Sequence, residues 1–372
     1  MRANKFRIYP TKAQEKQLNS HLRQSKDSWN EMLEFTKELY KDYGMFPTKR
    51  TLREFVKPSC LYSQVGQELV DRFCDSLWKK SNPKAGFPRF KPFDRMKSLV
   101  YPQSGFSLGE KLKVTPFGEI SIKKHREIKG VIKTLTLKRE SSGKWYAIFS
   151  IQEEKCFPKE NNGEKVGIDL GLTNFAALSN GRFIKNPRHF KKHEERLAFL
   201  QRNLSKHKKG SRNRRKAKVK VAVEHGRISN CRSDFHHKLS HELVNSYSLI
   251  ALEALRSKEM AEQRFGKSIH DAGWNMFANM LAYKAAGAGC EVMFVDPRNT
   301  TKECSCCGTV VKKTLSDRTH NCPFCGLTID RDLNAAINIL TRATAGTAGS
   351  NASRDETAVS SRKEDATRFI GW

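Results

Sequence analysis

The clearest chemical signal in the sequence comes from cysteines near its C-terminal end. Cys304 and Cys307 form one C-x-x-C pair, and Cys322 and Cys325 form a second pair after a 14-residue spacer. Each pair offers two thiolates from one tight turn, and two such turns complete a tetrahedron around zinc. Four thiolates leave no open position for a substrate, so we predict a structural zinc. Cys306 lies between the first two ligands, and we expect it to point away from the metal.

Two acidic residues stand at unusual places in apolar segments. Asp169 lies inside "VGIDLG", and Glu253 ends the apolar run "LIALE". A buried charge without a partner is costly, so each acid is expected to bind something. A shared cation site would satisfy both acids, and a lysine partner for each would do so as well.

The segment "DRDLNAAINIL" supplies a third acid. Asp332 shares a helical face with the apolar residues three, four and seven positions later, so it is predicted to face the core. Asp330 lies roughly 200° away around the helix and is better placed to cap its N-terminus. Asp169, Glu253 and Asp332 are therefore our candidates for holding two divalent cations about 4 Å apart, which would activate water for phosphodiester hydrolysis.

Positive charge indicates a polyanionic partner. The 372 residues include 69 Lys and Arg against 39 acidic residues, a net charge of +30 that favours nucleic acid over membrane. Residues 202–220 hold ten basic residues and no acids, whereas a solvated helix face would carry opposing acids. We therefore predict phosphate contacts in this run. The candidate residues are Lys206, Lys208, Lys209, Arg212, Arg214, Arg215, Lys216 and Lys218.

The sequence favours a reducing compartment. No apolar run reaches the ~18 residues of a membrane helix, and the first residues lack the apolar stretch of a signal peptide. Five of the ten cysteines are scattered singly and the other five crowd between positions 304 and 325, which suits a metal site better than disulfides. We expect a cytoplasmic protein, associated with the nucleoid of a prokaryote, without a membrane partner.

The elements that must position these residues change in character near residue 160. Before it, the strand "NKFRIYP", a long helical pattern capped by Thr11, further helix at about 48–80 and the hairpin "VIKTLTLKRESSGKWYAIFSIQEE" predict a small β-barrel interrupted by helices. After it, "KVGIDLGLTNFAALSNGRFIK" predicts three strands. A helical stretch over 187–248, the strand "SLIALEAL", a helix around "DAGWNMFANMLAYKAAGAG", the strand "CEVMFVD" and the helix "DLNAAINILTRA" follow. The expected fold class is α/β plus β.

Taken together, the motifs resemble the TnpB family, transposon-encoded relatives of the CRISPR type V effector nucleases. The resemblance rests on "GIDLGLTN", "IALEALRSKEM", "DFHHKLSHELV", "TKECSCCG", "CPFCG" and "DRDLNAAINIL", and extends to "NKFRIYPTKAQ" and "GFPRFK". It implies an RNase H-like (RuvC) nuclease domain with an inserted zinc ribbon, preceded by a wedge-type β-barrel with a helical recognition insertion. Its three catalytic acids would be Asp169, Glu253 and Asp332, and all three are present.

The resemblance also implies domain boundaries. The ribbon would sit beside the last acid because it is inserted directly before the final helix of the nuclease sheet. The composition after residue 343 is dominated by Ala, Gly, Ser, Thr and charge, which predicts disorder. The expected boundaries are 1–10 and 84–158 for the wedge-type barrel, 11–83 for the helical insertion, 164–300 and 327–342 for the RuvC-like domain, 301–326 for the zinc ribbon that would bind target nucleic acid, and 343–372 for a disordered tail.

The implied function is RNA-guided DNA cleavage next to a short transposon-associated motif. The expected cofactors are two Mg²⁺ ions, a structural Zn²⁺ and a guide RNA from the transposon end, and the expected partners are that RNA and double- and single-stranded target DNA, with one chain per RNA. A transposase acting directly on transposon ends is one alternative, which the lack of a visible helix-turn-helix signature or tyrosine nucleophile motif disfavours. An RNA-guided repressor without cleavage is another, disfavoured by the three intact acids.

Overall fold

The computed structural model describes residues 2–78, 86–152, 161, 163–255, 260, 262, 266–314 and 316–345. The chain divides into two compact units, Met1–Lys155 with Arg215–Val223, and Cys156–Arg214 with Glu224–Trp372. Residues 343–345, the first three of the predicted disordered tail, are helical, and the rest of it, from position 346 onward, lies outside the described residues. None of the described helices is long and apolar enough to span a membrane.

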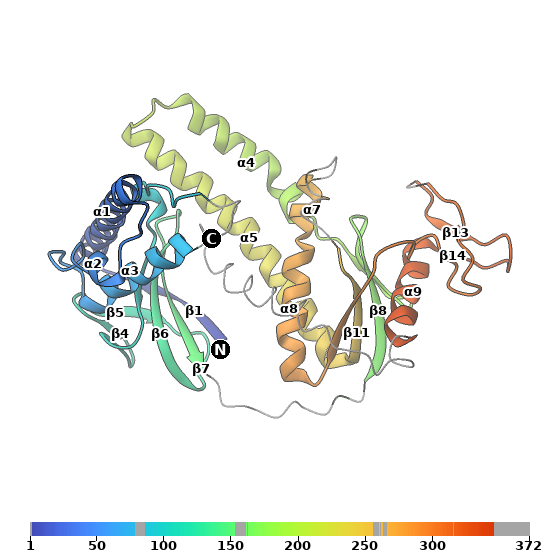
Figure 1. Cartoon of the computed structure of the whole chain (residues 1–372). Helices are drawn as coiled ribbons and strands as arrows, with labels where there is room; N and C mark the ends of the chain where they lie inside the picture. The colour runs from blue at the N-terminus through green and yellow to red at the C-terminus, as the bar shows by residue number, and fades with distance from the viewer. Residues whose placement is uncertain are drawn as a thin grey trace. The chain divides into compact units, whose positions relative to one another are not determined.

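The first unit contains a seven-stranded sheet that forms a nearly closed, barrel-like structure (Figure 1). The strand order is β2-β6-β7-β1-β5-β4-β3, and the predicted hairpin is confirmed as the antiparallel pair β6 and β7. The strands are β1 (Arg2–Tyr9), β2 (Ser98–Tyr101), β3 (Phe106–Leu108), β4 (Leu112–Val114), β5 (Gly118–Lys123), β6 (Val131–Arg139) and β7 (Trp145–Gln152).

Helices fill the interval between β1 and β2 in this unit. They are α1 (Lys12–Tyr43), α2 (Lys49–Arg53), α3 (Ser63–Trp78) and the short 3-10 helix η2 (Phe93–Arg95). Thr11 caps α1 as predicted, in a capping box with Gln14. Trp29 of α1 packs edge-on against Phe73 of α3 with ring centroids 5.1 Å apart, so the helices share the core of the barrel unit.

The second unit is built on a five-stranded sheet with the order β10-β9-β8-β11-β12. The predicted strands are confirmed as β8 (Glu164–Leu170), β9 (Asn174–Leu178), β10 (Phe183–Lys185), β11 (Tyr247–Glu253) and β12 (Glu291–Val295). The first three strands pair antiparallel, whereas β11 runs parallel to both β8 and β12. The carboxyl ends of β8 and β11 therefore lie at the same edge of the sheet.

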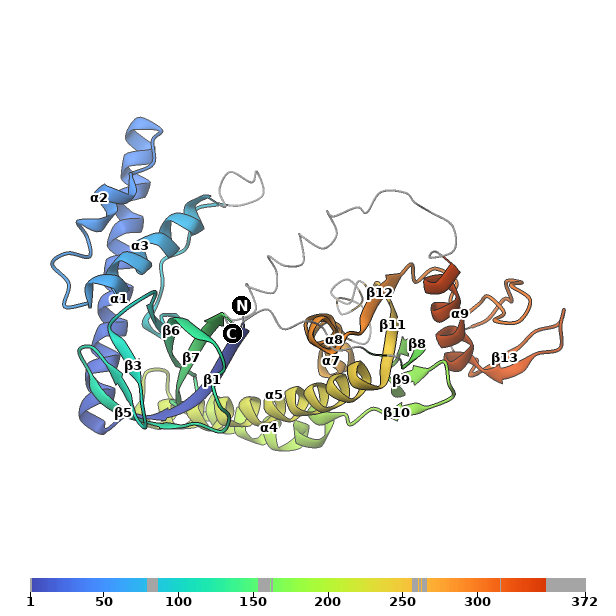
Figure 2. The ribbon, with the colours of Figure 1, turned by 90° about the horizontal axis from the view of Figure 1, so that it is seen from below.

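Helices cover both faces of this sheet. The helices that follow β10 in the chain are α4 (His189–Lys206), α5 (Arg212–Ser246), α7 (Gly266–Ala272), α8 (Trp274–Ala288) and α9 (Arg331–Ala345). Ile250 and Leu252 of β11 pack with α5 and α8, whereas Leu249 and Ala251 pack with α9, as the alternation of a strand requires. Figures 1 and 2 both show the sheet between α8 and α9.

The cysteine segment lies in the chain between β12 and α9. It contains a two-stranded hairpin of β13 (Thr319–Asn321) and β14 (Thr328–Asp330), paired antiparallel. Strand β14 ends at the residue before α9 begins, so the position of this segment is coupled directly to the start of that helix.

Candidate active site and cysteine cluster

Strand β8 sends alternate residues to its two faces. Val166, Ile168 and Leu170 pack into the core on the α5 and α8 side, so Gly167 and Asp169 lie on the face that α9 covers. A Cβ atom at Gly167 would lie 2.1 Å from the backbone oxygen of Ala336 and 2.7 Å from the backbone nitrogen of Leu340. A glycine is therefore required here for α9 to pack this closely against β8.

The register of the parallel strands brings Asp169 beside Glu253. Ala251 pairs with Gly167, and Leu252 pairs with Ile168. The next residue on each strand is Glu253 and Asp169, and Glu253 shares the α9 face with Ala251 because it lies two positions further along β11. The sheet therefore holds two of the three predicted acids on adjacent strands and on one face.

Helix α9 brings Asp332 to the same edge. Asp332 lies four residues before Ala336, about 6 Å along a helix, and Asp169 lies two residues beyond Gly167, about 7 Å along a strand. The negative charges of Glu253 and Asp332 both raise the pKa of Asp169, as neighbouring carboxylates do. The structure thus groups the three predicted acids at the carboxyl edge of β8 and β11.

Asp169 is the most deeply placed of these acids. Asp169 is only 9% exposed. Burial is the largest of the causes that raise its pKa well above the ordinary value for an aspartate. Within the described part of the chain, no residue donates a hydrogen bond or forms an ion pair with this carboxylate. A buried carboxylate without a partner is unfavourable, so the site fits a bound cation.

Glu253 is held by a residue that the sequence analysis missed. The hydroxyl of Thr300 donates a hydrogen bond to its Oε1. Burial raises the pKa of Glu253, while this hydrogen bond and the charge of Arg342 act in the opposite direction. Nothing local in the sequence could have identified Thr300, since it lies 47 residues from Glu253 in the chain.

Asp330 and Asp332 have different roles at the start of α9. Asp330 accepts hydrogen bonds from the backbone nitrogens of Asp332 at 2.8 Å and Leu333 at 3.1 Å, which confirms the predicted cap. Asp332 instead pairs with Arg331, whose Nε and Nη2 lie 3.1 and 3.0 Å from Oδ1. The arginine beside the acid is visible in the sequence, but its orientation toward Asp332 is not.

The four predicted zinc ligands form a cluster. Cys304 Sγ lies 3.6 Å from Cys325 Sγ, and Cys307 Sγ lies 3.6 Å from Cys322 Sγ. Among the residues that the structure describes, only these four form a group of three or more possible ligands with all donor atoms within 4.8 Å of one another. The cluster could hold zinc, whereas the three carboxylates are neighbours that do not meet this spacing.

The two knuckles share one backbone design. In each, the glycine after the second cysteine donates to the oxygen of the first, Gly308 to Cys304 at 2.9 Å and Gly326 to Cys322 at 3.0 Å. Both glycines have a φ of 75°, a conformation that favours glycine, as the sequence pattern predicted. Cys306 is exposed and outside the cluster.

The basic run spans the end of α4, a turn and the beginning of α5. Most of its candidate residues are exposed, as phosphate contacts require. Arg214 differs, because it is half-buried and donates to the backbone oxygens of Leu204 at 2.8 Å and His207 at 2.9 Å. Lys218 pairs with Asp94. Arg214 therefore closes the turn between α4 and α5.

Three family models match the chain. The OrfB_IS605 model, described as "Probable transposase", matches residues 148–264, and the model "Cas12f1-like, TNB domain" matches residues 274–339. A model described as "Helix-turn-helix domain" matches residues 1–45. This match corrects the sequence-based statement that no helix-turn-helix signature is visible, although the described residues there form strand β1 and one continuous helix, α1.

Three curated relatives cover between 69% and 93% of the chain. A Streptomyces pristinaespiralis protein named "Putative RNA-guided DNA endonuclease" is 32% identical over 93% of this chain and 90% of its own length. The Escherichia coli protein of the same name, InsQ, is 32% identical over 69% of this chain and 68% of its own length. The "TnpB-like protein L770" of Acanthamoeba polyphaga mimivirus is 24% identical over 91% of this chain and 72% of its own length.

A solved structure shares the fold. The protein in a cryo-EM structure of a Cas12f1-sgRNA-target DNA complex aligns with a TM-score of 0.55 at 16% identity, over 88% of this chain and 83% of that one. At this level of identity the likeness concerns the fold alone. It agrees with the combination of a barrel-like sheet and a mixed sheet covered by helices on both faces.

Proposed function

The chain belongs to the TnpB family of RNA-guided DNA endonucleases encoded by IS605-type transposons, and we propose that it cuts guide-matched DNA at Asp169, Glu253 and Asp332. The observation that carries this site is the grouping of three acids from two parallel strands and one helix, of which Asp169 is buried and has no partner in the described part of the chain. Oxygen ligands of this kind suit hard divalent cations. Mg²⁺ is therefore the proposed cofactor.

The three acids have separate parts in holding the cations. A bound pair of Mg²⁺ ions would supply an activated water and stabilise the charge on the leaving oxygen. Asp169 is fixed by strand β8 in a site where burial limits access of water, which strengthens its attraction for a cation. Glu253 extends from the neighbouring strand β11 and accepts a hydrogen bond from Thr300. Asp332 extends from α9, where the positive charge of Arg331 pairs with its carboxylate.

We propose RuvC-like, RNase H-like architecture for the second unit. The mixed sheet, with three antiparallel strands followed by two parallel ones, supports this assignment. We further propose the wedge-type barrel with its helical recognition insertion for the first unit and a structural zinc ribbon at the cysteine cluster, with the boundaries expected from the sequence. The division of the chain near residue 155 and the four clustered thiols support these proposals.

The proposed partners are a guide RNA and target DNA, with one chain per RNA. In such a division of labour, base pairing to the guide reads the target, and the protein reads a short flanking motif and the shape of the duplex. The net charge of +30 supports an RNA partner, because each basic side chain near a phosphate releases counterions.

The test is whether the protein, with a copurified RNA whose guide segment has been changed, cuts DNA that matches the new guide. RNA that copurifies with the protein is sequenced, its guide segment is replaced, and plasmids with matched or scrambled targets are incubated with the complex and Mg²⁺. We expect linear product only from the matched plasmid. Strand joining at transposon ends without a guide would favour a transposase, and guide-dependent binding without cutting would favour a repressor.

A further inference from the structure

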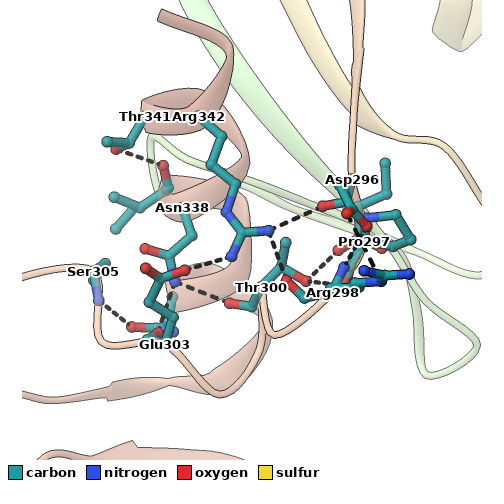
Figure 3. Close-up of polar contacts among 12 residues, drawn as sticks. Asp296, Pro297, Arg298, Thr300, Glu303, Ser305, Asn338, Thr341 and Arg342 are labelled. Atoms are coloured by element: carbon teal, nitrogen blue, oxygen red, sulfur yellow. Dashed lines mark hydrogen bonds and ion pairs between the residues drawn. The ribbon is translucent and has the colours of Figure 1, made fainter. Parts of the chain in front are cut away.

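One face of α9 holds the loop between β12 and the first cysteine knuckle. Asn338 donates from Nδ2 to the backbone oxygens of Thr300 at 2.9 Å and Glu303 at 2.7 Å. Arg342 donates to the backbone oxygens of Asp296 and Arg298 and pairs with the Glu303 carboxylate (Figure 3). The loop is therefore fixed to the helix at several points.

A third residue of the same helical face extends this contact to the knuckle. Asn334 donates to the backbone oxygen of Glu303 at 2.7 Å and accepts from the backbone nitrogen of Ser305 at 3.0 Å. Asn334, Asn338 and Arg342 are spaced four residues apart and so follow one face of α9. We call them the polar clamp; its two asparagines are buried, at 0% and 6% exposure.

Thr300 connects the clamp to Glu253. Its residue is only 2% exposed, its backbone oxygen is held by Asn338, and its hydroxyl donates to Glu253. A hydroxyl has one proton, and the backbone oxygen of Pro297, 3.2 Å away, is the alternative acceptor. The ionised carboxylate is the stronger acceptor of the two, so the proton is assigned to Glu253.

We propose that Thr300 is a positioning residue that orients the Glu253 carboxylate for divalent cations. Its hydroxyl occupies Oε1, and no described residue donates a hydrogen bond to Oε2, which leaves that oxygen for a cation. The polar clamp fixes the loop that contains Thr300 to α9, and α9 is also the helix that carries Asp332. This inference rests on the proposed function, because it takes Glu253 as a cation ligand.

Manganese provides a readout that is independent of cleavage. Mn²⁺ favours the same oxygen ligands as Mg²⁺. An ion that binds only the folded protein raises its thermal midpoint, and the shift grows with the logarithm of the ion concentration divided by its dissociation constant. The midpoint of the zinc-loaded protein is measured against Mn²⁺ concentration for the wild type, Thr300→Val and Thr300→Ser, and Glu253→Gln supplies the background from other sites. We expect Thr300→Val to need about ten-fold more Mn²⁺ for the same shift, and Thr300→Ser to match the wild type.

Matched variants separate positioning from a general loss of stability. Thr341→Val makes the same chemical change on α9, where the hydroxyl donates only to Ile337 within the helix, and should leave the Mn²⁺ response unchanged. Thr300→Ala removes the hydroxyl without placing a methyl against the carboxylate, and replaces Thr300→Val if that variant does not fold.

Two outcomes would overturn the inference in distinguishable ways. If Thr300→Val lowers the midpoint without Mn²⁺ but keeps the wild-type Mn²⁺ dependence, Thr300 only anchors the loop. If the wild type responds no more than Glu253→Gln, Glu253 is no cation ligand, and the proposed cleavage site fails together with the role of Thr300.

Discussion

At the scale of residues, the three acids of the proposed active site differ in their burial and in the groups that contact them. Asp169 is buried and has no partner among the described residues, Glu253 accepts a hydrogen bond from a hydroxyl, and Asp332 is paired with an arginine. A buried charge is retained in a fold only where something compensates it. Of the three acids, Asp169 is therefore the one whose burial a bound cation would compensate most.

His236 gives a pH prediction away from the carboxylates. It is 1% exposed, packs against aromatic rings, and its pKa is lowered to about 4, chiefly by burial. The positive charges of Arg232, His189 and His237 also lower it, and a hydrogen bond to the Ala272 backbone partly opposes them. The folded pKa lies below the unfolded one, so the unfolded state binds the proton first and stability falls as the pH drops from about 6.5 toward about 4.

The measurement is urea unfolding at pH 7 and pH 5. The wild type should lose about 2 kcal/mol more than His236→Gln over this interval. All other ionisable groups are the same in the two proteins, so the comparison isolates the contribution of His236. Equal losses for the two proteins would show that His236 is not buried in its neutral form.

Local patterns in the sequence predicted the acids but not their partners. Asp169, Glu253, Asp330 and Asp332 each stand out against an apolar strand or a helix start, so their neighbours in sequence single them out as candidates. Thr300 and the asparagines of the polar clamp act across distances of 31 to 47 residues. Their roles depend on which loop packs on which helix, and a sequence pattern does not contain that information.

At the scale of elements, the packing of α9 on β8 decides where Asp332 lies. The sequence predicted both elements, but it did not predict that Gly167 is the point where they touch. Similarly, the predicted helix around "DAGWNMFANML" is interrupted at Gly273, whose φ of 64° ends α7 before α8 begins. Contacts between elements thus account for most of what the sequence pattern could not supply.

Gly167→Ala tests this contact. The added methyl would lie 2.1 Å from the Ala336 oxygen, which is backbone and cannot rotate away, so α9 must shift. We expect a loss of about 1 to 3 kcal/mol, typical of overpacking, and a larger loss of cleavage than of RNA binding because Asp332 moves with the helix. Gly226→Ala, at a helical glycine with open space, is the control. Unchanged stability for Gly167→Ala would contradict the close packing of α9.

The four clustered cysteines are predicted to bind one zinc ion per chain. Replacing Cys304, Cys307, Cys322 or Cys325 by serine should lower bound zinc below one ion per chain, because each supplies one of four thiolates. Cys306→Ser should retain the full amount, since this thiol is exposed and outside the cluster. Elemental analysis of the purified proteins measures this. Loss of zinc in the Cys306 variant alone would mean that the ligand set is wrong.

At the scale of the whole molecule, the excess of positive charge favours a polyanionic partner, and the structure shows which of the predicted basic side chains are exposed. Arg214 was predicted as a phosphate contact, but it holds backbone oxygens of the α4–α5 turn. Lys208, Lys209, Arg215 and Lys216 are exposed. Lys206 and Arg212 are exposed as well, so they remain candidates for phosphate contact together with these four, which are the residues changed in the test.

Neutralising these four residues with glutamine should flatten the salt dependence of nucleic-acid binding. Each lost phosphate contact removes roughly 0.7 to 0.9 from the slope of log affinity against log salt, so the slope should fall by about 3. The target preference should remain, because phosphate contacts carry no sequence information. Arg214→Gln is the control and should mainly lower the thermal midpoint. An unchanged slope in the four-residue variant would show that the run is a solvated surface.

The most direct test of the proposed active site is a cleavage assay on four alanine variants bound to guide RNA. Asp169→Ala, Glu253→Ala and Asp332→Ala should each abolish cutting of the matched plasmid and retain RNA binding, because each removes a cation ligand. Asp330→Ala should cut at the wild-type level and lose only about 1 kcal/mol of stability, as expected for a helix cap. Cutting by any of the first three variants, or its loss in Asp330→Ala with retention in Asp332→Ala, would contradict the assignment.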